Sequence, residues 1–292
     1  MSISSRRSFL KAGGAVAVAA CAGAERLAGK SLHIPMGLKL PIGLQLYSVR
    51  QLLAKDFDGT LGKVKAAGYT EVEAAGYYDR TAAEFRLGVD KAGLRCTSTH
   101  HPLDVLLARP DELIEYGHKL GVDYIVSPSA SHRNPTAEGP LTMDDWHFSA
   151  DELNRIGEKV KAAGMTFGYH NHDTEFGSED GVVFYDELLK LTDPKLVVFE
   201  MDCGWVVAAG RNPVEYLIKW PDRFVLLHVK DMVRGANGNY HSTEMGKGVA
   251  DYRVILRAAK RLKRYYIEQE DFDIDPIAAI RMDAEYMRKL KL

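Results

Sequence analysis

The stretch Phe167-Gly168-Tyr169-His170-Asn171-His172 is a short apolar run that ends in residue types which bind metals, and three later runs repeat the pattern. These are Leu196-Val197-Val198-Phe199-Glu200-Met201-Asp202, Phe224-Val225-Leu226-Leu227-His228 and Tyr265-Tyr266-Ile267-Glu268. An ionisable side chain at the end of a buried strand costs free energy unless a partner compensates it. One divalent cation at the mouth of a barrel would compensate all four. The four runs therefore predict the fold and a metal site together.

A second repeat joins a helix that ends in Gly to a short strand. Gly68, Gly93, Gly121 and Gly164 each follow a Lys within a few residues and precede a strand-like run. Gly accepts the left-handed conformation at a helix C-terminus, and Lys suits the negative end of the helix dipole. With an opening run at 42–47, this predicts about eight strands alternating with helices, which is the α/β architecture of a single-domain (β/α)8 TIM barrel.

Helical patterns lie between the strands, and we expect helices at 61–67, 82–92, 111–120, 150–163, 184–191, 214–220, 253–262 and 276–290. The alternative fold is an open doubly wound sheet. That fold would need a Gly-rich phosphate loop after its first strand, and the sequence at 47–50 offers none. We expect one barrel domain at 38–292, with no second domain after it.

Composition agrees with a globular enzyme. The chain has 292 residues, of which 46% are hydrophobic and 27% charged, and its net charge is −2. This length is enough for one large α/β domain. Neither a basic excess nor an acidic tail is present, so nucleic acid is not an expected partner.

The N-terminus is typical of an export signal. Ser5-Arg6-Arg7-Ser8-Phe9-Leu10-Lys11 has the twin-arginine pattern, and a weakly apolar stretch at 12–20 follows that is too short to span a membrane. We expect residues 1–30 to be a twin-arginine signal peptide and the protein to be periplasmic. Val18-Ala19-Ala20-Cys21 also resembles a lipoprotein cleavage box, so a lipid anchor on Cys21 and cleavage nearby both stay open. Cys96 and Cys203 are expected to be buried thiols.

In barrel enzymes the site lies at the C-terminal ends of the strands. The predicted metal ligands are His170, Asp202, His228 and Glu268. Two imidazoles and two carboxylates suit one Mn²⁺, Co²⁺, Zn²⁺ or Fe²⁺ ion better than Ca²⁺. Further candidates at strand ends are Glu73, His100, His101, His172, Lys230, Asp231 and Glu270. Several have simpler interpretations: Glu73 as a salt-bridge partner, His101 as a turn residue, Lys230 as a rim charge and Asp231 as a loop cap.

The chain resembles the sugar phosphate isomerase/epimerase superfamily with the xylose isomerase-like barrel. The resemblance rests on residues 70–73, 169–176, 201–205, 228–231, 246–251 and 267–270. It implies a metal-dependent enzyme and a possible homodimer. In the epimerases the ligands are Glu, Asp, His and Glu, and Asp202, His228 and Glu268 match the last three. His170 occupies the place of the first Glu, which puts the two-Glu acid/base mechanism of the epimerases in doubt. Whether His170 or His172 binds the metal stays open.

The resemblance predicts a metal-dependent carbohydrate isomerase or epimerase that removes a proton next to a sugar carbonyl through a metal-bound enediolate. We expect His172 or Glu268 to be the base. We expect Lys230, Glu73 and His100 to orient sugar hydroxyls, and Trp205, Tyr47 and Phe176 to be either cavity walls or core residues.

Three other functions are considered. A lyase or dehydratase acting on a 3-keto sugar or keto-glycoside is favoured by the His at strand five and by the export signal. The substrate is then a free or glycosidic sugar, because no phosphate-binding loop is evident. A non-catalytic periplasmic sugar-binding lipoprotein would not need the row of ligands. An endonuclease would need more ligands and a basic surface.

Overall fold

The computed structural model describes residues 39–292. The predicted twin-arginine signal and Cys21 lie outside these residues. In the described part, no helix combines the length and apolarity needed to cross a membrane.

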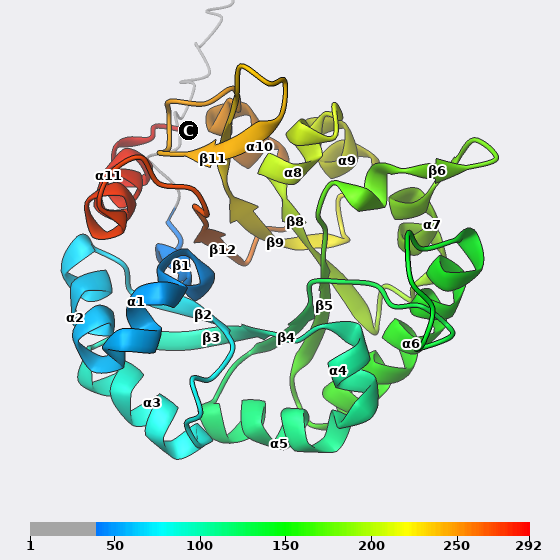
Figure 1. The fold of residues 1–292 in the computed structure, drawn as a ribbon, viewed down its shortest axis with the longest axis horizontal. Helices are drawn as coiled ribbons and strands as arrows, with labels where there is room; N and C mark the ends of the chain where they lie inside the picture. Colours follow the sequence, from blue (N-terminus) through cyan, green and yellow to red (C-terminus); the bar gives the residue numbers. More distant parts are fainter. Residues whose placement is uncertain (1–38) are drawn as a thin grey trace, which may run out of the picture. The chain divides into compact units, whose positions relative to one another are not determined.

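Eight parallel strands close into a barrel, which confirms the predicted fold (Figure 1). The order around the barrel is β1-β12-β9-β8-β5-β4-β3-β2, so the first strand pairs with the last. The strands are β1 (Gly43–Gln45), β2 (Glu71–Ala75), β3 (Arg95–His100), β4 (Tyr124–Ser127), β5 (Thr166–His170), β8 (Val197–Asp202), β9 (Phe224–Val229) and β12 (Arg264–Ile267). Gly43 permits the closure, because a Cβ there would lie 2.5 Å from the Tyr266 ring.

Helices form a ring outside the barrel (Figure 1). They are α1 (Arg50–Lys55), α2 (Phe57–Ala67), α3 (Ala82–Lys91), α4 (Leu103–Ala108), α5 (Pro110–Leu120), α6 (Met143–Ala162), α7 (Phe184–Leu191), α8 (Cys203–Ala208), α9 (Pro213–Lys219), α10 (Tyr252–Ala258) and α11 (Pro276–Lys289), with 3₁₀ turns η1 (Leu46–Val49) and η2 (Thr174–Phe176). All eight expected helices are present, and the glycines predicted to end them have positive φ angles: Gly68, Gly93, Gly121 and Gly164.

Helix boundaries differ most where side chains cap a helix. The helix expected from residue 150 begins at Met143, because Thr142 and Asp145 form a capping box there. The helix expected to run to residue 262 ends at Ala258. The short helices α1, α4 and α8 were not predicted, since six residues are too few to show a 3.6-residue period.

Two antiparallel hairpins were also missed. One consists of β6 (Ser178–Glu179) and β7 (Val182–Val183), and the other of β10 (Asp231–Arg234) and β11 (Tyr240–Thr243). In the first hairpin Asp180 and Gly181 both have positive φ, as a tight turn between two strands requires. The second hairpin directly follows β9, and its Ser242 hydroxyl accepts hydrogen bonds from the backbone N–H groups of Glu270 and Asp271 after β12.

Candidate active site

The four predicted ligands come together at the C-terminal mouth of the barrel. One nitrogen or oxygen of each of His170, Asp202, His228 and Glu268 lies within 4.8 Å of those of the other three, and all four residues are buried. The His228 Nδ1 atom is 3.1 Å from Glu268 Oε2 and 3.8 Å from Asp202 Oδ2. The His170 Nε2 atom is 4.0 Å from the same Asp202 oxygen. We call these four side chains the rim cluster.

Backbone contacts fix the direction of Asp202. Its Oδ1 atom accepts a hydrogen bond from the Trp205 N–H and so caps α8. The amide of Asn171 bonds both the N–H and the C=O of Asp202, which ties the ends of β5 and β8 together. Oδ2 is thereby left to face the rim cluster, where it accepts no hydrogen bond of good geometry although the Lys230 ammonium lies 2.9 Å away.

Lys230 is fully buried beside the rim cluster, so the interpretation as a solvated rim charge is wrong. Its Nζ atom lies 2.9 Å from Asp202, 2.8 Å from Glu268 and 2.5 Å from Glu270. Burial by itself would lower the pKa of Lys230, but the charges of these three carboxylates raise it above the ordinary value. Lys230 is therefore an ammonium that holds these carboxylates in place.

A second group of ionisable residues lies deeper in the barrel. Sequence reasoning missed Glu200, which is fully buried. Its Oε2 atom is 2.8 Å from His100 Nε2, 3.3 Å from His170 Nδ1 and 3.2 Å from His228 Nε2. Glu73, also fully buried, is 2.7 Å from His228 Nε2 and 3.1 Å from His100 Nε2. We call Glu73, His100 and Glu200 the deep cluster.

Strand alternation could have identified Glu200. It stands two residues before Asp202, so both side chains project to the same face of β8. Glu200 lies inside an apolar run and before the strand end, so it does not match the pattern of ionisable residues that end a strand.

The carboxylates of the deep cluster and the neighbouring charges shift the pKa values of the imidazoles beside them. Burial by itself would lower the pKa of His100, but Glu73 and Glu200 raise it to about 9. Burial and the neighbouring charge of His228 lower the pKa of His170. His170 is consequently neutral, which is the state in which an imidazole binds a metal.

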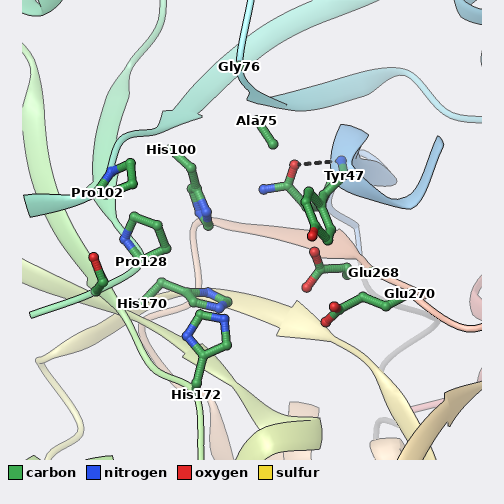
Figure 2. A pocket seen from close by; sticks show the side chains of 12 residues that line it. Tyr47, Ala75, Gly76, His100, Pro102, Pro128, His170, His172, Glu268 and Glu270 are labelled. Carbon is green, nitrogen blue, oxygen red and sulfur yellow. Dashed lines mark hydrogen bonds between the residues drawn. The ribbon is translucent and has the colours of Figure 1, made fainter. Parts of the chain in front are cut away.

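A cavity of about 380 Å³ opens above the rim cluster (Figure 2). Its lining comprises Gln45, Tyr47, Ala75, Gly76, His100, Pro102, Pro128, Ser129, His170, His172, Glu268 and Glu270. Figure 2 shows the three imidazoles and the two carboxylates facing a common space, with the rings of Pro102 and Pro128 along one edge. The lining therefore combines a polar floor with an apolar wall, and none of its residues within 39–292 is a Lys or Arg.

The other predicted site residues lie outside this cavity. Glu73 is below it and contacts Gln45 and the imidazoles. The Trp205 ring packs against the Lys230 ammonium, 4.8 Å away. Phe176 packs on Tyr185 and is a core residue.

The simpler interpretation of Asp231 fits the structure, and His101 is a buried residue outside the cavity rather than a turn residue. The His101 ring lies 2.8 Å from the Tyr77 hydroxyl, away from the cavity. Asp231 caps a loop, because its carboxylate accepts hydrogen bonds from the backbone N–H groups of Gly246, Gly248 and Ala250. The thiols of Cys96 and Cys203 are free and buried, as expected.

The rim cluster fits a divalent cation. A tetrahedral ion with bonds of about 2.0–2.2 Å separates its ligand atoms by about 3.4 Å, and the rim distances of 3.1, 3.8 and 4.0 Å surround that value. The Asp202 Oδ2 atom, buried and without a good hydrogen bond, faces the same point. Two imidazoles and two carboxylates favour Zn²⁺, Mn²⁺, Co²⁺ or Fe²⁺.

A closed parallel barrel with a cluster of ionisable side chains at its C-terminal mouth is the architecture of a (β/α)8 barrel enzyme. The chain belongs to the xylose isomerase-like TIM barrel family, whose model matches residues 61–290.

The chain is similar to three proteins with known names or structures. An inosose dehydratase of Clostridium beijerinckii is 26% identical over 193 residues, which cover 60% of this chain and 63% of that protein. The match thus spans less than two thirds of that relative's length. A sugar phosphate isomerase/epimerase from Parabacteroides distasonis is 29% identical, with a TM-score of 0.74 and coverage of 86% of this chain and 98% of that one. An IolI protein with a bound zinc atom shares the fold at 14% identity, with a TM-score of 0.66 over 84% of this chain and 96% of that one.

Proposed function

We propose that this protein is a metal-dependent lyase that removes a proton beside the carbonyl of an unphosphorylated keto-sugar or keto-cyclitol and eliminates water. The observation that carries the proposal is the cavity lining, which in the described part of the chain offers imidazoles and carboxylates but no Lys or Arg. A phosphorylated substrate would need a cationic partner for its phosphate. The similarity to an inosose dehydratase supports the same reaction class.

His170, Asp202, His228 and Glu268 would hold the cation. When bound, such an ion supplies a Lewis acid that polarises the substrate carbonyl and acidifies the adjacent C–H.

The base in this proposal is His172. Its imidazole lines the cavity beside His170, at a ring distance of 5.0 Å, and within residues 39–292 no hydrogen bond engages its ring nitrogens. Glu268 is less suited, because burial would raise its pKa but the charges of Lys230 and His228 lower it well below the ordinary value. Such a carboxylate is a weak base.

Elimination of water needs only one side chain that acts first as a base and then as an acid. His172 takes the proton from carbon, the bond to the hydroxyl oxygen on the next carbon breaks as the double bond forms, and the imidazolium returns its proton to that oxygen, which leaves as water. Epimerisation would need a second base on the opposite face of the sugar. Glu268 and Glu270, the two carboxylates that line the cavity, are held by Lys230.

A pair of variants separates metal binding from proton transfer. We expect His170→Ala to lose metal, measured by elemental analysis. We expect His172→Ala to keep its metal and to lose about 10²–10⁴-fold in kcat, because general-base catalysis contributes that much. The opposite pattern would contradict both assignments.

The reaction class is tested by NMR in D₂O with metal-loaded protein and a panel of an inosose, a 3-keto-glucoside and a ketose phosphate. Loss of water from an unphosphorylated substrate is the expected outcome. Deuterium incorporation with inversion and no elimination would instead identify an epimerase, and a preference for the phosphate would contradict the substrate class. Sugar binding without turnover would favour the binding-protein alternative.

We also propose export through the twin-arginine pathway, with Cys21 either lipidated or removed with the signal. The support is the sequence at 5–21 alone. Cell fractionation of the wild type and of a variant with Arg6→Lys and Arg7→Lys tests it: the variant should accumulate in the cytoplasm. Equal distribution of the two would contradict export by this route.

A further inference from the structure

We infer that Glu200 is a positioning residue that, together with Glu73, fixes the tautomers of the two candidate imidazole ligands, so that His170 binds the cation through Nε2 and His228 binds it through Nδ1. The inference rests on the proposed metal site. It assigns a role to a buried carboxylate that does not line the cavity and that the proposed reaction does not otherwise use.

The two rings of His170 and His228 each bridge the rim cluster and the deep cluster. His170 turns Nε2 toward Asp202, at 4.0 Å, and Nδ1 toward Glu200, at 3.3 Å. A neutral imidazole has one N–H and one free lone pair. If Nδ1–H donates to Glu200, the lone pair of Nε2 is directed at the rim cluster, where the cation would lie.

His228 has the reverse orientation. Its Nδ1 atom faces Glu268 and Asp202, at 3.1 and 3.8 Å. Its Nε2 atom faces Glu73 at 2.7 Å and Glu200 at 3.2 Å. If the deep carboxylates accept the Nε2–H, the lone pair of Nδ1 is the one directed at the rim cluster, where a cation would take the place of the proton that Nδ1 now shares with Glu268. Carboxylates that accept the second N–H of ligand histidines orient the ring and raise its basicity.

A deep cation could instead lie between His100, Glu200 and the two rim imidazoles, since one ligand atom of each of His100, His170, Glu200 and His228 lies within 4.8 Å of the others. The distances favour hydrogen bonds. Within this group His100 lies 2.8 Å from Glu200, shorter than the separation of about 3.4 Å between ligands of one tetrahedral ion, although His170 and His228 lie 3.3 and 3.2 Å from Glu200. The Nε2 atom of His228 is also engaged by Glu73 at 2.7 Å, outside the group. A second deep cation would also need lone pairs from the nitrogens that donate protons to the carboxylates.

The test compares metal binding by the wild type and Glu200→Gln, titrated with Zn²⁺ against a chelating competitor. The amide keeps the shape of the side chain and removes its charge. We expect one equivalent of metal in both proteins and an affinity that is about 10–100-fold weaker in the variant. The matched control is Glu71→Gln, also buried on a barrel strand but paired with Arg264. It should leave the affinity unchanged.

A second measurement needs no variant at Glu200. The ¹⁵N NMR spectrum of metal-loaded wild type, assigned with His170→Ala and His228→Ala, should show a protonated Nδ1 in His170 and a protonated Nε2 in His228. The opposite tautomer in His170 would overturn the inference, as would unchanged affinity in Glu200→Gln. Two equivalents of metal in the wild type and one in the variant would overturn it in favour of a deep cation. Failure of the wild type to bind any metal would instead contradict the proposed function.

Discussion

At the scale of the residue, burial decides what each ionisable side chain does. Lys230 follows a strand in the sequence as a surface lysine would, yet the structure places its ammonium among three carboxylates, shielded from water. A buried charge is tolerated only where partners compensate it. Lys230 and the carboxylates around it are therefore mutually dependent, and removing one leaves the others uncompensated.

Replacing Lys230 tests this dependence. We expect Lys230→Met to lower the free energy of unfolding of the metal-free protein by about 3–5 kcal/mol, because Asp202 and Glu268 would keep buried charges without their partner. Urea denaturation in the presence of a chelator measures the change. Lys247→Met is the control: its ion pair with Glu244 involves a Lys side chain that is 54% exposed, and its loss should cost less than about 1 kcal/mol. Equal effects of the two substitutions would contradict the role given to Lys230.

At the scale of the element, caps decided where helices begin. The apolar period predicts the body of α6, but Asp145 determines its start. That side chain accepts hydrogen bonds from the backbone N–H groups of Thr142 and Arg133, and so joins the helix to the preceding loop. Burial by itself would raise the pKa of Asp145, but these bonds lower it to about 2.

The cap makes a pH-dependent contribution to stability. Because the pKa is lower in the folded state than in the unfolded chain, the ionised carboxylate stabilises the fold above about pH 4, and this contribution is lost as the pH falls toward 2. We expect Asp145→Asn to lower the free energy of unfolding by about 1–2 kcal/mol at pH 7 and by much less near pH 2. Denaturation at several pH values measures this change in the free energy of unfolding. Asp144→Asn, at an exposed position of the same first turn, should show a smaller effect, and a pH-independent loss in Asp145→Asn would contradict the explanation.

At the scale of the whole molecule, the rim cluster joins strands that are far apart in the chain. His170 and Glu268 are separated by almost a hundred residues, yet barrel closure brings both to one cation-sized space. A cation that binds only this assembled state must stabilise the folded molecule.

Metal removal should therefore lower global stability. At a free metal concentration of about 100 times Kd, we expect the free energy of unfolding to rise by about 2.7 kcal/mol over the chelated protein. Asp202→Asn should abolish the difference while keeping Oδ1 to cap α8. Urea denaturation with and without metal measures both, and a metal effect that survives in Asp202→Asn would place the ion elsewhere.

The fold and the positions of the four candidate ligands could be predicted from local sequence patterns. The Gly residues that end helices, the apolar runs and their ionisable ends predict a (β/α)8 barrel and bring His170, Asp202, His228 and Glu268 to one mouth, because parallel strands in a barrel all end on the same side. These features depend on backbone conformation and period, which neighbouring residues determine.

Only the tertiary structure decided which side chains of the site are buried and which contact one another. No local pattern shows that Lys230 is enclosed, that Trp205 packs against it, that Phe176 is a core residue or that Glu200 contacts three imidazoles. Burial and charge compensation depend on which strands become neighbours when the barrel closes, and the side chains that meet there come from distant parts of the chain. The sequence thus determined which groups reach the mouth, and the closed barrel decided which of them are charged, shielded and free to react.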